Sequence, residues 1–423
     1  MSVQAGFAEI DITPPVGVQK VGWTRTIISD HVVDPLYARA AVFETSDERI
    51  AFIQLDTLFA PAELVGRLRA AISAEYGFAG EKVMVCATHN HAGPAIYDVG
   101  FVRQDPGYVD ALADKVVAVF GSALASRRQA EIGFGRCFEF RVAHNRRVVM
   151  RDGTVRTHGS FSDPAALYVE GPIDPEVAVL VARPLEGKLL GVLVNFTCHP
   201  THHGGDTALS AGYPGALAVE LKSRGCGVPL FLQGASGNVH FEDPAGVRPA
   251  QSLESIGQIL AEDVTAILAT MRFTRRAQLV GRAATVHLPL RTLTDQQIDA
   301  SGPGAQRFVE PELHDCGMPE LVDRINQMDG EPAEVQVLRV GDVVFAANGG
   351  ECFVELGLAI KQRSRPLDAV VVCYANGRLG YIPTRDAFRR GGYETTFGLS
   401  SWLAPEAGDM LVDATVDLIG QEG

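Results

Sequence analysis

The chain lacks long hydrophobic runs and basic stretches, and each absence excludes a class of protein. No apolar run reaches the roughly 18 residues that a membrane span requires, and residues 1–10 lack the basic start and apolar core of a signal peptide. We therefore expect a cytoplasmic protein without stable membrane association. The formal net charge is -14 at pH 7 and no basic stripe offsets it, so nucleic acid is not an expected partner.

Several signatures of other chemistries are also absent. The seven cysteines form no C-x-x-C pair, and we interpret them as reduced core residues because several lie inside apolar runs. The glycines form neither a G-x-G-x-x-G motif nor a P-loop, which argues against nucleotide binding. Ser236 lacks the G-x-S-x-G elbow of serine hydrolases. What is present is a globular composition, 46% hydrophobic and 21% charged, without low-complexity segments.

Apolar runs and helical spacing alternate along the chain. Strands are predicted at 39–43, 50–54, 83–86, 190–194, 228–232, 335–340, 343–347 and 369–373, and helices within 64–72, 109–120 and 253–267. This order predicts an α/β fold with a mixed β-sheet core and flanking helices, in one domain over residues 1–423. The segment 291–330 carries Gly, Pro, Asp and Gln with weak periodicity, and we expect a surface excursion there.

Six of the eleven histidines lie in three clusters that directly follow predicted strands. These histidines are His89 and His91, then His199, His202 and His203, then His240. Polar groups at the ends of rigid strands can be aimed at one point, and Glu351 follows another strand in the same way. Two histidines and a carboxylate are typical ligands of a catalytic zinc, which keeps one position for water and lowers the pKa of that water to about 7.

This pattern resembles the neutral (non-lysosomal) ceramidases and their bacterial relatives, which are zinc amidases. The matching segments are spread over nearly the whole chain, at residues 11–15, 87–94, 145–146, 199–201, 350–351, 380–384 and 393–394. The resemblance implies that His89, His199, Glu351 and Tyr381 hold the zinc. It also implies that His91, Arg146 and Tyr393 contact the scissile amide, and Tyr393 follows Tyr381 at the spacing found in the family.

The chain departs from the ceramidase pattern in two respects. Ceramidases carry a serine at the scissile amide in a Gly-Asp-x-Ser-Pro segment, whereas the corresponding segment here is Gly237-Asn238-Val239-His240. The sequence also has no counterpart of the C-terminal sandwich domain of the ceramidases. We therefore expect hydrolysis of a small soluble amide rather than of a sphingolipid.

The expected mechanism is attack on a carbonyl by a water molecule that the metal activates. His91 or Asp56 would take the proton of the water and return it to the leaving nitrogen, and Arg146 and Tyr393 would clamp the substrate or its oxyanion. His240 would either act as a base, lowering kcat/KM and shifting the pH profile when replaced by serine, or pack in the space of the missing serine.

Some alternatives stay open from the sequence. The same metal could serve hydrolysis of an ester or a glycoside-type bond, or the chain could be a non-catalytic metal-binding relative. A second metal near His202, His203 and Asp206 competes with a solvated loop as the explanation of those side chains. The acyl and amine halves of the substrate, and whether the chain forms a homo-oligomer, are not determined.

Overall fold

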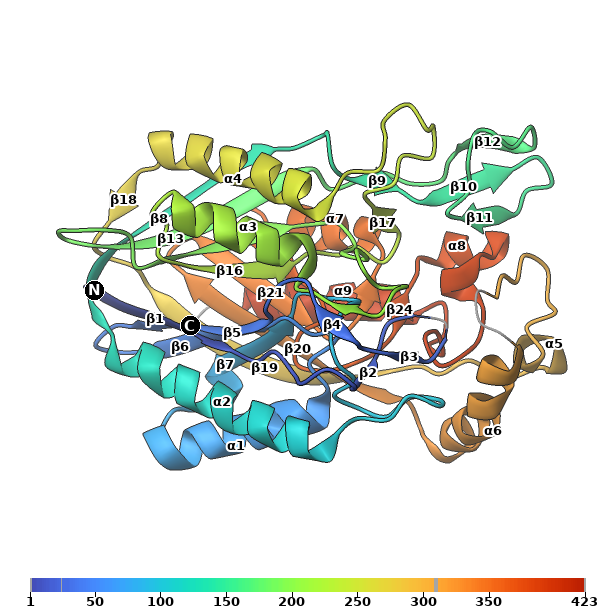
Figure 1. Cartoon of the computed structure of the whole chain (residues 1–423), viewed down its shortest axis with the longest axis horizontal. Helices are drawn as coiled ribbons and strands as arrows, with labels where there is room; N and C mark the ends of the chain where they lie inside the picture. Colours follow the sequence, from blue (N-terminus) through green and yellow to red (C-terminus); the bar gives the residue numbers. More distant parts are fainter. Residues whose placement is uncertain (1, 24, 308–310, 422–423) are drawn as a thin grey trace.

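Two β-sheets pack face to face in the computed structural model, which describes residues 2–23, 25–307 and 311–421 (Figure 1). The larger sheet has the strand order β16-β14-β13-β8-β1-β5-β6-β7, with β18 beside β8. Its strands are β1 (Val3–Asp11), β5 (Tyr37–Glu44), β6 (Arg49–Leu55), β7 (Val83–Ala87), β8 (Arg128–Phe138), β13 (Glu176–Pro184), β14 (Gly191–Phe196), β16 (Val228–Gln233) and β18 (Phe273–Thr274).

The smaller sheet has the order β19-β20-β21-β23. Its strands are β19 (Leu279–Leu288), β20 (Glu331–Val340), β21 (Val343–Asn348) and β23 (Asp368–Val372). Phe52 of the larger sheet contacts Phe43 and Phe345 edge to face, with ring centroids 6.0 and 5.0 Å away, and so joins the two sheets. Because side chains alternate along a strand, the inner faces of both sheets share one apolar core while their outer faces are left for helices.

Helices cover both outer faces and complete a four-layer αββα arrangement (Figure 1). The larger sheet is covered by α1 (Ala62–Tyr76), α2 (Pro106–Ala125), α3 (Gly212–Ser223) and α4 (Leu253–Thr270), and the smaller by α7 (Val354–Arg363) and α9 (Ala407–Gly420). No helix in the described part of the chain combines the length and apolarity that crossing a bilayer requires.

The expected mixed α/β fold is confirmed. Each strand and helix predicted above is present, with its ends moved by a few residues. The neighbours β6 and β7, β14 and β16, and β21 and β23 are parallel, whereas the other main pairs are antiparallel. Four longer strands, β1, β8, β13 and β19, were not predicted. Many side chains of β8 and β19 are partly exposed and break the apolar runs, whereas the apolar run of β13 was overlooked.

The segment 291–330 is more than a surface excursion. It contains α5 (Asp295–Ile298) and α6 (Pro311–Gln327), while residues 308–310 lie outside the described residues. Met318, Leu321 and Ile325 of α6 are buried in the core beside α9. The internal Pro319 explains the weak periodicity, since proline interrupts the helical pattern without preventing the helix from packing.

Candidate metal centre and active site

Three histidines converge at the carboxyl ends of the parallel strands, and we call them the three-histidine centre. His89 and His91 lie in the loop after β7, and His199 lies in the loop after β14. The Nε2 atom of His89 is 2.9 Å from that of His199 and 3.2 Å from that of His91. All three side chains are buried.

Backbone carbonyls fix the direction of each of these rings. The Nδ1 atom lies 3.0 Å from Leu58 O in His89, 2.6 Å from Gly22 O in His91 and 3.0 Å from Ser236 O in His199. A carbonyl oxygen only accepts, so each Nδ1 donates its hydrogen and each Nε2 is left to face the centre. Histidines that bind a metal are typically anchored in this way through their other nitrogen.

Lone pairs that face one another at such distances require a cation or a proton between them. Burial, followed by the charge of neighbouring His89, lowers the pKa of both His91 and His199 well below the usual value, so protonation is disfavoured. Because His91 and His199 resist protonation, the group fits a metal ion better than it fits a shared proton.

Glu351 adds a carboxylate to this donor set. It begins β22 (Glu351–Cys352), and its Oε2 lies 3.3 Å from His89 Nε2 and 3.8 Å from His199 Nε2. Gly237 permits the close approach of the loop after β16, because a side chain there would collide with the Glu351 carbonyl. The three histidines form a group able to hold a metal ion, and Glu351 brings a carboxylate oxygen beside two of them, His89 and His199.

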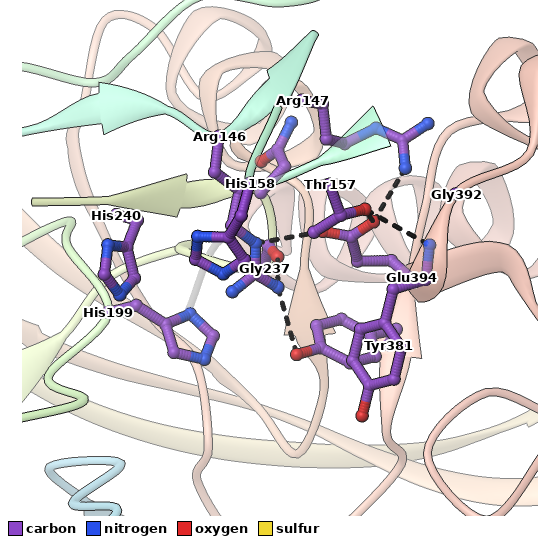
Figure 2. Close-up of polar contacts among 12 residues, drawn as sticks. Arg146, Arg147, Thr157, His158, His199, Gly237, His240, Tyr381, Gly392 and Glu394 are labelled. Carbon is purple, nitrogen blue, oxygen red and sulfur yellow. Dashed lines mark hydrogen bonds and ion pairs between the residues drawn. The ribbon is translucent and has the colours of Figure 1, made fainter. Parts of the chain in front are cut away.

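Tyr381 lies beside Glu351. It begins β24 (Tyr381–Ile382), which pairs with β22 in parallel so that Glu351 and Tyr381 are register partners. Burial, and then the charge of Glu351, raises the pKa of Tyr381 well above its usual value. Its hydroxyl accepts a hydrogen bond of 3.0 Å from Arg146 Nη2 (Figure 2).

His89 adopts a backbone conformation that is unusual for a residue with a side chain. Its φ is 62°, and Tyr374, whose ring stacks on it at 3.8 Å, has φ 57°. Such left-handed residues cost free energy and persist where the surroundings hold them in place. The Tyr374 hydroxyl is 3.0 Å from the fully buried Ser236 hydroxyl, so Ser236 supports the ring stack and is not presented to a substrate.

A cavity of about 200 Å³ opens beside the centre. His89, His91, Glu351, Tyr381 and Tyr393 lie on its wall. Much of the remaining wall is aromatic, formed by Trp23, Phe59, Tyr97, Phe101 and Phe397. The cavity is therefore suited to a substrate that has an apolar part next to the group that reacts.

The similarity of this chain to known proteins lies in its fold. No family model and no curated protein matches the sequence. Among solved structures, the neutral ceramidase from Pseudomonas aeruginosa superposes with a TM-score of 0.76 at 19% identity, over 99% of this chain and 74% of that chain. A ceramidase complexed with C2 superposes with a TM-score of 0.76 at 18% identity, over 99% of this chain and 75% of that chain. This chain has the fold of the neutral ceramidases.

Arg146 is not among the residues that line the cavity beside the three-histidine centre. Figure 2 shows its guanidinium in contact with the Tyr381 hydroxyl. Its Nε donates to Glu394 Oε1 at 2.9 Å, and its Nη2 donates to Gly237 O and to the Tyr381 hydroxyl. Burial alone would raise the pKa of Glu394, but Arg146 and Arg147 bring it to about 2. Arg146, which the sequence suggested as a substrate clamp, thus does not line this cavity, whereas Tyr393 does.

Asp56 is not brought to the centre. Its carboxylate accepts hydrogen bonds from Tyr37 N at 2.8 Å, Gln54 Nε2 at 2.9 Å and Arg39 Nη1 at 3.3 Å. Burial raises its pKa, and Arg39 opposes that rise. These contacts tie β5 to β6 and give no support to the proton transfer expected of Asp56.

His240 belongs to a second group, the outer cluster, which consists of His158, His240 and Glu242. The backbone N–H of Glu242 donates to His240 Nδ1 at 3.1 Å, so Nε2 carries the hydrogen and donates to Thr201 Oγ1 at 2.6 Å. Both ring nitrogens of His240 are therefore in use. The ring also stacks on Phe241 at 4.2 Å, which favours the packing role among the two left open by the sequence.

The histidines considered for a second metal do not come together. His202 Nε2 lies 3.0 Å from Gln251 O, whereas His203 Nδ1 contacts Asp206 Oδ2 at 2.8 Å. The buried Lys20 holds this loop by donating to the backbone oxygens of His203 and Asp206. Within the described residues, these three side chains form no group able to hold a metal.

Residues that the sequence did not identify complete the site. Glu394 neutralises Arg146 and Arg147, and Arg378 reaches the cavity between aromatic rings. Arg378 belongs to the segment 374–381 that follows β23, which the sequence marks as a strand end. Its partners Phe59, Tyr97 and Trp402 come from distant parts of the chain, so local spacing carried no signal for its role.

Proposed function

We propose that this chain is a zinc-dependent hydrolase that cleaves the linear amide bond of a small soluble substrate. The observation that carries this proposal is the convergence of three imidazole lone pairs and the Glu351 carboxylate at the wall of a cavity. The fold shared with ceramidases, which are amidases, supports an amide as the group that is cleaved.

His89, His199, Glu351 and Tyr381 would hold the metal in this proposal. A zinc ion there would supply Lewis-acid chemistry, lowering the pKa of a water molecule and polarising a carbonyl group. Arg146, fixed by Glu394, keeps the Tyr381 hydroxyl in place. Buried ligands with fixed rings need little reorganisation when the ion binds.

His91 would transfer the proton during hydrolysis. Its Nε2 faces the centre and its Nδ1 is fixed by Gly22 O, so the ring is placed to take a proton from a water molecule held there. Gly22 is required there, because it has φ 104° and a Cβ would lie 2.9 Å from His91 Nδ1. The proton taken from water then goes to the leaving nitrogen, while Tyr393 donates to the carbonyl oxygen from the cavity wall.

Elemental analysis followed by a hydrolysis panel tests this function. We expect about one zinc per purified chain, loss of activity with a chelator, and cleavage of N-acyl amides in preference to matched esters and glycosides. Absence of any transition metal, or an acyl-enzyme trapped on Ser236, would contradict the proposal. A retained metal without hydrolysis of any class would instead favour the non-catalytic relative.

A further inference from the structure

The cavity wall is cationic although the chain as a whole is acidic. Arg25, Arg307 and Arg378 lie on this wall, and Glu351, already assigned to the metal, is the one acidic residue among the described residues that line it. The whole chain has 51 acidic and 37 basic residues, so this excess of positive charge is local. A cleft lined by charge of one sign attracts ligands of the opposite sign.

Arg378 is held on this wall by aromatic rings. Its guanidinium carbon lies 5.9 Å from the ring centroid of Phe59, 5.1 Å from that of Tyr97 and 5.3 Å from that of Trp402. Its Nη2 donates to Leu399 O at 2.6 Å, whereas its Nε is buried without a hydrogen-bond partner in the described structure. Stacking fixes the plane of the guanidinium but leaves its charge without a counter-ion.

Two buried arginines show how this chain satisfies a guanidinium, whereas Arg378 is partly exposed on the cavity wall. Arg146 is paired with Glu394. Arg291 has no carboxylate, but its Nε, Nη1 and Nη2 donate to Leu403 O, Thr395 O and the Ser401 hydroxyl. Across the described residues, Arg378 has no ion pair, and its acceptors are Leu399 O and the Tyr97 side chain, with Nε left without one. A purely structural role therefore does not account for its charge.

Arg378 lies close enough to the metal centre for one small substrate to reach both. The Phe59 ring is 5.4 Å from the His89 ring and 5.9 Å from the Arg378 guanidinium carbon. An amide bound at the centre would therefore place a group a few bonds away against Arg378. A planar guanidinium matches a carboxylate through two parallel hydrogen bonds, and a single arginine suits a carboxylate better than a phosphate.

We propose that Arg378 is a specificity-determining residue that binds a carboxylate of the substrate, so that the site acts on amides carrying a carboxylate, such as N-acylated amino acids. This inference rests on the proposed hydrolase function. The apolar part of the same substrate lies on the aromatic wall formed by Trp23, Phe101 and Phe397.

Binding of simple probes tests the subsite independently of catalysis. Trp23 lines the cavity and Trp402 packs on Arg378, and these are the two tryptophans of the chain, so intrinsic fluorescence reports on ligand binding. We expect the purified full chain to bind phenylacetate about 10–100-fold more tightly than the neutral phenylacetamide. Arg378→Met should remove this difference, whereas Arg385→Met, on the exposed α8 (Arg385–Arg390), should preserve it.

The results of these binding experiments distinguish carboxylate binding at Arg378 from binding at the metal, and they do not depend on the hydrolase function. The metal centre is intact in Arg378→Met, so phenylacetate binding that stays unchanged in that variant would overturn the proposal. Tighter binding of phenylphosphonate than of phenylacetate would overturn the carboxylate assignment. If Arg378→Met does not fold, Arg378→Lys replaces it in the test. Lysine keeps the charge but lacks the planar guanidinium that makes two parallel hydrogen bonds, so this variant should lose part of the preference for phenylacetate over phenylacetamide.

The kinetic test uses N-phenylacetylglycine and its neutral amide, N-phenylacetylglycinamide. We expect kcat/KM to favour the carboxylate by about 10–100-fold in the wild type, with the preference lost through KM in Arg378→Met. An equal loss of activity toward both substrates would show a structural role and overturn the inference. Failure to cleave any amide would count against the hydrolase function, whereas the probe-binding result would still decide the subsite.

Discussion

Two neighbouring groups of side chains differ in how their ring nitrogens are used. The three-histidine centre and the outer cluster adjoin, with the His199 and His240 rings 6.4 Å apart (Figure 2). In the centre, every Nδ1 is held by a carbonyl and every Nε2 is directed inward. In the outer cluster, both nitrogens of His240 are engaged, and the His158 and Glu242 side chains are 34% and 56% exposed.

The comparison shows that proximity of ligand-type residues does not by itself make a metal site. His158 and Glu242 lie 3.3 Å apart as a partly solvated pair, whose attraction is satisfied without a metal. In the centre, buried lone pairs face one another, and a cation relieves their repulsion. Burial of all members and the direction of the lone pairs therefore distinguish the three-histidine centre from the partly solvated outer cluster.

Removal of one histidine from each group gives the largest expected difference. We expect His199→Ala to reduce the zinc content from about one per chain to near zero and to abolish turnover, because a buried ligand is lost. His158→Ala should leave both unchanged, since that side chain is partly exposed and outside the centre. Metal content by elemental analysis and turnover on an N-acyl amide measure the two effects.

The outer cluster would be the metal site if these results were reversed. Zinc lost from His158→Ala and kept by His199→Ala would contradict the comparison. His89→Ala serves as a second variant of the centre and should behave as His199→Ala does, because its Nε2 contacts the same point.

His91 separates proton transfer from metal binding within the centre. We expect His91→Ala to reduce kcat by about 10²–10⁴-fold while zinc is retained, as is typical when a general acid–base group is lost. Ser236→Ala is the matched control and should keep nearly full turnover, because the Ser236 hydroxyl contacts Tyr374 away from the cavity. Loss of zinc from His91→Ala would make His91 a ligand instead.

Glu394 is linked to both groups through its ion pair with Arg146. Burial first, then a neighbouring histidine and then Arg146 lower the pKa of His199 and of His240. We expect Glu394→Gln to reduce the free energy of unfolding by about 3–5 kcal/mol, because two buried arginines lose their shared carboxylate. Denaturant unfolding measures this loss. An unchanged denaturant midpoint in Glu394→Gln would mean that solvent reaches Arg146 and Arg147.

The same carboxylate makes stability depend on acid. The pKa of Glu394 falls from 4.5 to about 2 on folding, so unfolding takes up a proton between these values. The stabilisation is therefore complete above about pH 4.5 and is lost as the pH falls through about 2. Glu394→Gln should show a shallower decrease in stability over this range than the wild type.

Much of the fold could be predicted because its central strands are buried on both faces and appear as continuous apolar runs. The runs at 83–86 and 343–347 are examples, and both match strands of the structure. The partly exposed strands β8 and β19 gave no such run. The packed part of 291–330 was also missed, since Pro319 and neighbouring glycine obscure the helical period.

The site was predictable where the function depends on which type of residue follows a strand, as it does for His89, His199 and Glu351. It was not predictable where the function depends on the direction in which a side chain points. Asp56 follows a strand as the histidines do, but its carboxylate turns to Arg39. Arg378 obtains its environment from rings far away in the sequence, which only the tertiary structure brings together.

The smallest expected effect concerns His240, which the sequence placed at the position of the ceramidase serine. We expect His240→Ser to lower the free energy of unfolding by about 1–3 kcal/mol, because the Glu242 N–H and the Thr201 hydroxyl lose their partner and the stack on Phe241 is lost. His158→Ser, in the same cluster but partly exposed, should change stability by less than about 0.5 kcal/mol. Thermal or denaturant unfolding measures both.

The pH–rate profile of His240→Ser then decides between the two roles that the sequence allowed. Burial, and then the charges of His158 and Arg146, lowers the pKa of His240 well below its usual value, so the ring stays neutral at and above neutral pH. A neutral ring with both nitrogens bonded contributes no titration to catalysis, and the profile should keep its shape in the variant. A shift of one limb on the amide that the wild type cleaves would instead place His240 among the proton-transfer groups, and the outer cluster would have to be joined to the centre.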